Sequence, residues 1–337
     1  MPRGFTSKLV IFIALALAVA GGLIVYADVD DFLDALSRFK WGLAPLILAL
    51  VLANYALRFL KWHYFLSVIG ATGALPLVTS ALIFLSGLAM VITPAKAGEF
   101  IKSYFLQKAN GTPIQRSTPV IFAERFSDGM AVFLLSLAGL FFFEPSYWPF
   151  FAVVGLLLVA LLAAIHVRRF AHGALRLIER LPLLRHTGEH LEEVYESAYA
   201  LLAPWPLFIA VSLGLVGWGC EAVGLYLVVY GLTDESSLDI LVKSAFIMGV
   251  ASLAGALFVI PGGLGVSETS IAGLGRTLLD LSRSTAAAAT IMIRFFTLWF
   301  GVAVGLVALV VVSRRLAVTP EIPATIETAS RRSCVSE

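Results

Sequence analysis

Five charged residues stand inside long apolar runs of this sequence, and their types suit ion pairing, anion binding or proton transfer. A charge in mid-membrane costs roughly 2.5–3.5 kcal/mol on insertion scales, so residues of this kind are expected to be paired and functional. If transport by the chain is energised, protonation of one of these carboxylates is the available route. The five residues are Glu124, Arg125, Asp128, Glu221 and Arg294.

The spacing of these charges indicates which of them can pair. Glu124 and Asp128 are four apart on one predicted helix and share a face, and Arg125 precedes Asp128 by three positions and can pair with it. Arg294 has no acid in its own apolar run. Two interpretations follow: the arginines bridge to acids and hold the helices together, or they contact an anionic substrate. The partners available to Arg294 are Glu99, Glu221, Glu268 and a ligand anion.

A stretch rich in glycine, PGGLGVSE from Pro261 to Glu268, interrupts the apolar run that precedes Arg294. Gly263 and Gly265 carry no side chain, so a backbone or a head group can approach closely. We expect Ser267 to be the N-cap of a short helix with Glu268 in its first turn. The free N–H groups of such a helix end suit a phosphate, although Glu268 could satisfy them itself.

A weaker copy of this stretch, PAKAGE from Pro94 to Glu99, precedes the helix of Arg125. The prolines are 261 − 94 = 167 residues apart, and the arginines are 294 − 125 = 169 apart. Broken helices at corresponding places of two halves indicate an internal repeat and a transport site. Lys96 and Lys102 flank the first break, where they could collect anionic lipid or simply snorkel to the interface. The candidate substrate-binding residues are Lys96, Glu99, Glu124, Arg125, Asp128, Glu221, Gly263, Gly265, Ser267, Glu268 and Arg294.

The composition indicates that these residues lie in a polytopic membrane protein. Hydrophobic residues make up 59% and charged residues 14% of the 337, against roughly 25% charged in soluble domains. Two cysteines exclude a disulfide framework or a cysteine-rich metal site. The chain contains no Walker A loop and no HExxH motif, and nothing suggests a Ser-His-Asp arrangement, so we expect no enzyme activity and no cofactor.

Charge placement predicts an all-α fold with six full transmembrane helices. The first apolar run could also be read as a cleaved signal peptide, but it continues past the small-residue site, which favours a helix. Lysines and arginines should lie inside, which orients both termini toward the cytoplasm and leaves the aspartate-rich loop 27–40 outside. The predicted spans are 9–26, 41–57, 118–143, 150–165, 206–230 and 286–312.

Two further apolar segments do not fit as full crossings. A full crossing would place the charged residues that flank each segment on the side of the membrane that the positive-inside rule disfavours. Each is therefore predicted to be a re-entrant hairpin, and the two enter from opposite faces, which makes the repeats inverted. The repeat units are about 75–143 and 238–313 within one domain, 1–316. Segment 167–204 should lie on the inner surface, and 317–337 should be a disordered tail. His186, Glu189, His190 and Glu193 have metal-compatible spacing, but a solvated helix face explains them as well.

The motifs TPAKAGE (93–99), AERFSD (123–128) and PGGLGVSE (261–268) followed by Arg294 resemble the lysylphosphatidylglycerol synthase transmembrane-region family. The resemblance covers roughly residues 5–315. It implies a lipid-translocating domain of the bacterial inner membrane in which two re-entrant elements and their Glu and Arg residues surround a head-group cavity. The synthases carry a soluble aminoacyl-transferase domain that we do not find here, so aminoacylation is not carried over.

The leading functional hypothesis is a lipid flippase that moves a lipid between leaflets through a cavity at the repeat interface. The lipid could be an anionic phospholipid, an aminoacyl-lipid, a glycolipid, an isoprenoid-linked lipid or a hopanoid. The alternative is a membrane accessory subunit of a lipid- or glycan-modifying enzyme, and an intramembrane head-group enzyme would need a nucleophile or metal set that we do not find. Expected partners are the lipid, a lipid-modifying synthase and further copies of the chain, with no nucleic acid.

Overall fold

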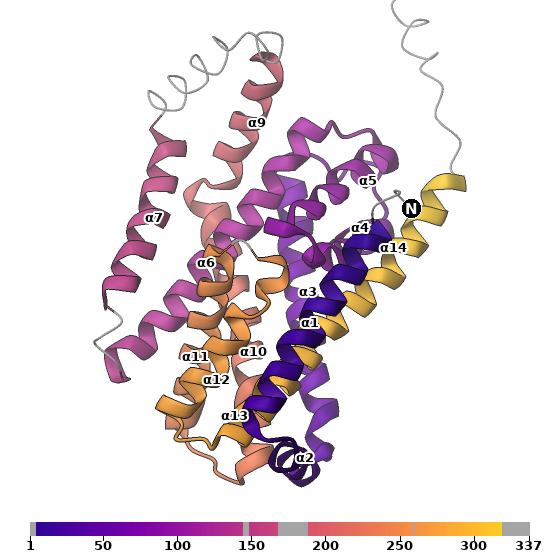
Figure 1. Cartoon of the computed structure of the whole chain (residues 1–337). Coiled ribbons are helices and arrows are strands. Elements are labelled where there is room, and N and C mark those ends of the chain that lie inside the picture. Colours follow the sequence, from indigo (N-terminus) through magenta and orange to yellow (C-terminus); the bar gives the residue numbers. More distant parts are fainter. Residues whose placement is uncertain (1–4, 144–147, 168–187, 259, 319–337) are drawn as a thin grey trace, which may run out of the picture.

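The computed structural model describes residues 5–143, 148–167, 188–258 and 260–318, and this part of the chain is helical without strands (Figure 1). The side chains of 5–8, 94–96, 138, 140–143 and 188–190 lie outside the description as well. Much of the predicted surface segment 167–204, the tail 319–337 and three of the four residues with metal-compatible spacing therefore fall outside it.

The first half of the chain forms long helices and one interrupted pair of short ones. A proline in the first turn starts α3 without loss of a hydrogen bond, and Gly111 ends α5 in the left-handed region at φ 78°. The elements are α1 (Phe5–Ala27), α2 (Val29–Arg38), η1 (Trp41–Leu43), α3 (Ala44–Val68), α4 (Leu77–Leu88), η2 (Ala89–Ile92), η3 (Pro94–Phe100), α5 (Ile101–Asn110) and α6 (Ile114–Phe143).

The described part of the second half again contains a long apolar helix, a short break and further helices. Ser237 and Ser282 accept backbone N–H bonds and thereby cap α11 and α13. A π-helical segment, η6, follows Arg294 directly and joins α13 to α14. The elements are α7 (Trp148–His166), α9 (Gly188–Leu201), α10 (Pro204–Thr233), α11 (Leu238–Leu257), η5 (Pro261–Gly263), α12 (Val266–Leu278), α13 (Arg283–Arg294), η6 (Phe295–Trp299) and α14 (Phe300–Val318).

Six helical stretches of the described chain are long and apolar enough to cross a membrane. Five of them coincide with predicted spans, and the sixth is α11, which the sequence assigned to a hairpin. The predicted span 118–143 corresponds to α6, which is not among the six and carries three charges in one turn and a half. The five shared stretches are Leu9–Ala27, Trp41–Val68, Trp148–His166, Pro204–Thr233 and Arg283–Ala317.

Each interrupted pair of helices folds back on itself, and the two interruptions meet. α4 contacts α5, α11 contacts α12, and η5 contacts both η2 and η3. In Figure 1 α4 and α5 occupy the upper half of the molecule, whereas α11 and α12 occupy the lower half. Two chain segments far apart in sequence therefore bring their breaks together near the middle of the bundle.

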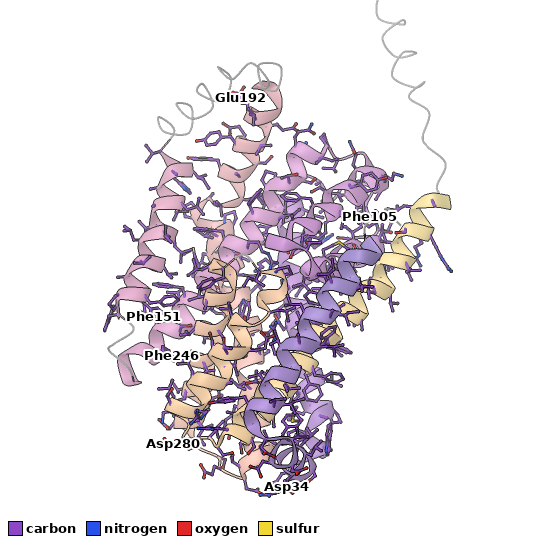
Figure 2. All side chains as sticks on the ribbon, in the orientation of Figure 1. Asp34, Phe105, Phe151, Glu192, Phe246 and Asp280 are labelled. Carbon is purple, nitrogen blue, oxygen red and sulfur yellow. The ribbon has the colours of Figure 1, made fainter. Side chains whose placement is uncertain are left out.

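Loops that were predicted to lie on opposite sides of the membrane are found at opposite ends of the molecule. Asp34, from the loop 27–40 predicted to lie outside, and Asp280 are found at the lower end in Figure 2. Glu192, from the segment predicted to lie inside, is at the opposite end, toward which both the start of α1 and the end of α14 also point.

The bundle contains two main apolar cores that correspond to the two halves. One gathers α3, α4, α5 and α6 with parts of α10 and α14, and the other gathers α10, α11, α12 and α13 with parts of α6 and α7. On the last long helix, α14, a Cβ at Gly305 would collide with the backbone of Ala89. This contact places α14 against the first break.

Candidate functional site

The first break is a change from α-helix to 3₁₀-helix on both sides of an extended residue. Thr93 has φ −95° and ψ 146° between η2 and η3, because Pro94 disfavours a helical conformation at the residue before it. The Thr93 hydroxyl donates to the carbonyl of Met90 at 2.7 Å and accepts from the N–H of Gly98 at 2.8 Å. The predicted turn at 93–94 is confirmed, and it brings Glu99 toward α6.

The second break is a glycine turn held by side chains that follow it. Gly262, Gly263 and Gly265 all have positive φ, a region that residues with a Cβ avoid. The expected close approach at Gly263 occurs, but it is made by the protein, since a Cβ there would meet the Ser267 hydroxyl at 2.5 Å and the Cα of Gly255 at 3.4 Å.

The predicted cap of α12 is wrong by two residues. The N-cap is Gly265, and Ser267 lies inside the first turn, where its hydroxyl donates instead to the carbonyl of Ala251 at 3.1 Å. Glu268 reaches back and accepts from the Gly265 N–H at 2.7 Å. Glu268 thus itself satisfies one N–H group of this helix end, as the alternative interpretation expects.

Glu268 also binds Arg294, which answers the question of that arginine's partner. The Arg294 Nε donates to Glu268 Oε1 at 2.6 Å, and its Nη2 donates to the carbonyl of Gly262 at 2.5 Å. One arginine thus joins the long helix α13 to both the turn and the first residues of α12. Both side chains are largely buried, at 17% and 7% exposed.

Seven charged side chains meet around the first break, and we call them the seven-charge cluster. They come from three places: α3, the η3–α5 segment and α6. Each lies within 4 Å of an oppositely charged member, which makes the group continuous. Its members are Arg58, Lys61, Glu99, Lys102, Glu124, Arg125 and Asp128.

Lys102 and Glu124 form the most buried pair of the cluster. The Lys102 Nζ donates to Glu124 Oε2 at 2.6 Å, and the side chains are 3% and 0% exposed. Lys102 also lies 3.5 Å from Glu99 and over the ring of Trp62, 4.6 Å from its centroid. The interpretation of this lysine as a snorkelling side chain is wrong because its head is inside the protein, and its role as a lipid collector stays a prediction.

Asp128 is shared by three cations. Lys61 donates to its Oδ1, while Arg58 and Arg125 approach its Oδ2 at 3.7 and 3.5 Å. The predicted pairing of Arg125 with Asp128 is confirmed. The predicted span 41–57 ends too early, because α3 continues through Arg58 and Lys61 to Val68 and Lys61 is fully buried.

Glu221 lies on α10, which packs against α3. Asn54 on α3 donates to its Oε1 at 2.5 Å, and this contact joins α3 to α10. Next to Asn54, the Tyr55 hydroxyl donates to the carbonyl of Thr297 at 2.7 Å, inside the π-helical segment. A π-helical turn displaces backbone carbonyls from their usual partners, and here a tyrosine takes one of them.

The structure thus assigns the predicted residues to three places. Glu99, Glu124, Arg125 and Asp128 are in the seven-charge cluster, Gly263, Gly265, Ser267, Glu268 and Arg294 are in the second break, and Glu221 contacts Asn54 on α3. The Lys96 side chain is outside the description. Sequence reasoning missed Arg58, Lys61 and Asn54, although two charges within one turn of an apolar helix were a usable signal.

Together these features define a class: an all-helical, multi-pass membrane protein with buried charges gathered at two helix breaks. The chain belongs to the family described as the lysylphosphatidylglycerol synthase TM region, which it matches over residues 13–305. It is similar to two UPF0104 membrane proteins of Methanothermobacter thermautotrophicus. One is 25% identical over 309 residues, which are 87% of this chain and 90% of the relative. The other is 24% identical over 328 residues, which are 89% and 94%.

Proposed function

We propose that this protein moves a lipid between the leaflets of the membrane. The observation that carries the proposal is the meeting of two broken helices beside whose breaks Glu99, Lys102 and Glu268 are buried. Charges at membrane depth are costly and persist where they mark the path of a polar group. A lipid head group is such a polar group, and its acyl chains can stay in the surrounding bilayer.

The proposal includes two re-entrant hairpins, α4–α5 and α11–α12, related as inverted repeats. It is supported by the contact of α4 with α5 and of α11 with α12, and by the contacts of η5 with η2 and η3. α11 has 20 residues, enough to cross by length, so the hairpin proposal requires α12 to return beside it. In inverted-repeat carriers, rocking of one repeat against the other exposes the site to each side in turn.

The ion pairs describe one end state of such a cycle. Arg294 is held by Glu268 and by the turn, and Arg125 by Glu99 and Asp128, so the head-group site is closed in this conformation. Opening exchanges these internal partners for the head group. The free-energy difference between the two states stays small only because one set of polar contacts replaces another.

We place the protein in the bacterial cytoplasmic membrane with both termini inside and assign no covalent chemistry to it. The orientation is supported by Figures 1 and 2, in which the start of α1 and the end of α14 point toward the same end of the molecule as Glu192. The sequence of segment 168–187 is rich in arginine, and the positive-inside rule therefore assigns this segment to the cytoplasmic side.

The test is lipid translocation by purified protein in vesicles, followed through chemical quenching of a head-group-labelled fluorescent lipid in the outer leaflet. We expect Glu268→Gln and Arg294→Gln to slow translocation by about tenfold or more, since each removes a charge-assisted contact at the second break. Arg38→Gln is the matched control, because Arg38 is exposed and pairs only with Asp34 on its own helix among the described contacts. Translocation at wild-type rate in both variants would reject the proposal.

A second function, an accessory subunit of a lipid- or glycan-modifying enzyme, is favoured by one observation. The described interior charges pair with one another, as a purely structural core would. This function predicts that the protein co-purifies stoichiometrically with a synthase and gives no translocation alone. Translocation by the isolated chain would reject it.

A further inference from the structure

Helix α1 lies over the place where the two breaks meet. Its side chains Phe12 and Ala16 are buried in one apolar cluster with Ile92 of the first break and Leu264 of the second. The opposite face carries residues such as Leu17, which is 65% exposed. Figure 1 shows α1 crossing the front of the bundle beside α14. On this side of the bundle, α1 therefore lies between the two breaks and the lipid.

Phe12 is the residue of α1 that lies against the glycine turn of the second break. A Cβ at Gly262 would meet the Phe12 ring at 3.1 Å, and the centroid of that ring is 5.7 Å from the ring centroid of Trp299. The carbonyl of Gly262 is the one that accepts from Arg294. Phe12 thus covers the turn that holds this arginine. Moving the ring away uncovers the turn and breaks only apolar contacts of the Phe12 side chain.

The two halves of α1 are held in different ways. Buried side chains of the second half pack with α2, α12 and α13, the Tyr26 hydroxyl accepts from Arg276 at 2.6 Å, and Arg283 lies 5.4 Å from the Tyr26 ring centroid. The first half, residues 9–20, has no side chain with a described hydrogen bond or ion pair. Lipid chains are as apolar as the side chains that they would replace, so the first half can separate from the bundle at lower cost than the second.

Two glycines, Gly21 and Gly22, join these halves. Glycine in a membrane helix commonly permits the close approach of another helix, but a Cβ at either position would meet no described atom within 4 Å. Neither glycine has a positive φ, so no turn requires them. Adjacent glycines lower helix propensity, and pairs of small residues are a common place for a helix to kink. The pair is therefore a point at which α1 can bend.

We propose that α1 is the lateral gate of the lipid path. Its first half bends away at Gly21 and Gly22 and opens a portal between α1 and the two breaks, through which a lipid enters with its head group first. The inference rests on the proposed function and adds the route by which the substrate reaches the site. The second half stays attached through Tyr26 and its neighbours, so the helix returns to the closed position. The acyl chains remain in the bilayer and cover the surface that Phe12 leaves.

The test is the distance between two spin labels, measured by double electron–electron resonance on the purified full chain in nanodiscs of phosphatidylethanolamine and phosphatidylglycerol. The two native cysteines are replaced by serine. Labels at the exposed positions Ile11 and Val307 report on the first half of α1 against α14, and labels at Val25 and Thr277 report on the second half against α12. We expect two distance populations for the first pair and one for the second. A single population for the first pair would overturn the inference.

Alanine at the glycine pair should keep the gate closed without harming the fold. The double variant Gly21→Ala with Gly22→Ala strengthens the helix and places each new Cβ in open space, so the open population should fall by about fivefold or more. The SDS concentration that unfolds the protein should not fall. Gly273→Ala is the matched control, because Gly273 is an exposed glycine inside α12 with equally open space. An unchanged open population, or easier unfolding, would contradict the role of the pair.

A variant of Phe12 should have the opposite effect. Phe12→Ala removes the ring that packs against the turn in the closed state, so the open population should rise by about fivefold or more. Leu17→Ala, on the exposed face of the same helix, is the control and should leave it unchanged. If Phe12→Ala does not yield a monodisperse protein, Phe12→Leu removes the ring but keeps an apolar side chain, and a smaller rise is expected. An open population equal to that of wild type in the Phe12 variant would reject the gate.

Translocation assays separate this inference from the function on which it rests. The double glycine variant should translocate a head-group-labelled lipid about fivefold more slowly than wild type, in proportion to its open population. Equal rates would overturn the gate and leave the flippase function standing. Two populations of α1 that respond to the glycine and Phe12 variants, without any translocation by wild type, would keep the movement of α1 and reject the flippase function.

Discussion

The two breaks contain the same pair of residues in two different settings. Glu268 and Arg294 are 26 positions apart, and Glu99 and Arg125 are also 125 − 99 = 26 apart. The pairs are offset by 268 − 99 = 169 and 294 − 125 = 169 residues. The repeated unit is therefore an acid just after a helix break and an arginine on the long helix that follows.

The two Glu–Arg pairs differ in the distance between the arginine and the carboxylate. At the second break the Nε to carboxylate distance is 2.6 Å and the acid also caps α12, whereas at the first break it is 3.7 Å. The residues around the pair explain the contrast. At the offset of 169, Lys102, Glu124 and Asp128 correspond to the uncharged Ile271, Ile293 and Thr297.

This comparison shows that the same Glu–Arg pair can either link two helical segments through short hydrogen bonds, as a joint, or share its partners with other charged residues, as part of a network. At the second break few groups compete, so Arg294 makes short hydrogen bonds to one carboxylate and one carbonyl. At the first break several cations compete for three carboxylates, so Arg125 makes longer contacts to two of them. The first break is the better place for a ligand, and the second is the better place for a joint.

The largest expected effect comes from removing one member of the most buried pair. Lys102→Met leaves Glu124, which is 0% exposed, without its one described cation, and we expect a loss of about 4 kcal/mol in the free energy of unfolding. Unfolding in mixed micelles with rising SDS measures it. The double variant Lys102→Met with Glu124→Leu should recover most of the loss, and a double variant as unstable as the single would contradict the pairing.

A smaller effect is expected from the glycine turn of the second break. Gly263→Ala forces a Cβ into a position with φ 66°, against the Ser267 hydroxyl, and should cost about 2 kcal/mol. The same measurement on Gly98→Ala at the first break should give a smaller loss, because φ there is not positive and the nearest atom is the flexible Met90 sulfur. Equal losses would mean that the turn conformation does not distinguish the breaks.

The ion pairs themselves provide the most direct test of the comparison. Glu268→Gln replaces a 2.6 Å charged contact and should cost about 1.5 kcal/mol, while Glu99→Gln, with contacts of 3.5 and 3.7 Å, should cost about 0.5 kcal/mol. Chemical unfolding of both variants under identical conditions gives the difference. A larger loss for Glu99→Gln would reverse our assignment of joint and network.

A smaller effect than that of Glu268→Gln is expected at the π-helical segment, a feature of the second long helix with no counterpart in the description of α6. Tyr55→Phe removes the hydroxyl that donates to the carbonyl of Thr297 and should cost about 1 kcal/mol. Hydrogen exchange should rise locally in residues 295–299. Tyr64→Phe, whose hydroxyl makes no described hydrogen bond, is the control, and equal exchange in both would exclude a role for this contact.

Much of the fold follows from the sequence because bilayer length, apolar runs and charge placement constrain it strongly. The breaks at 93–94 and 261–265 were predicted by proline and glycine, whose backbone restrictions act locally. The cap of α12 was misplaced because Ser267 and Gly265 are both acceptable N-caps, and only packing against Ala251 distinguishes them. The span at 118–143 was predicted by its apolar ends, although three charges interrupt it.

The sequence by itself determined where the helices break, which side chains share a face and part of the set of charged residues inside apolar runs. Helical periodicity fixes these properties within one segment, and the pairing of Arg125 with Asp128 was predictable for that reason. The tertiary structure alone decided that Arg294 binds Glu268, that Lys61 binds Asp128 and that Lys102 turns inward to Glu124. Those partners lie on different helices, and a periodic pattern specifies the face a helix buries but not the neighbour it meets there.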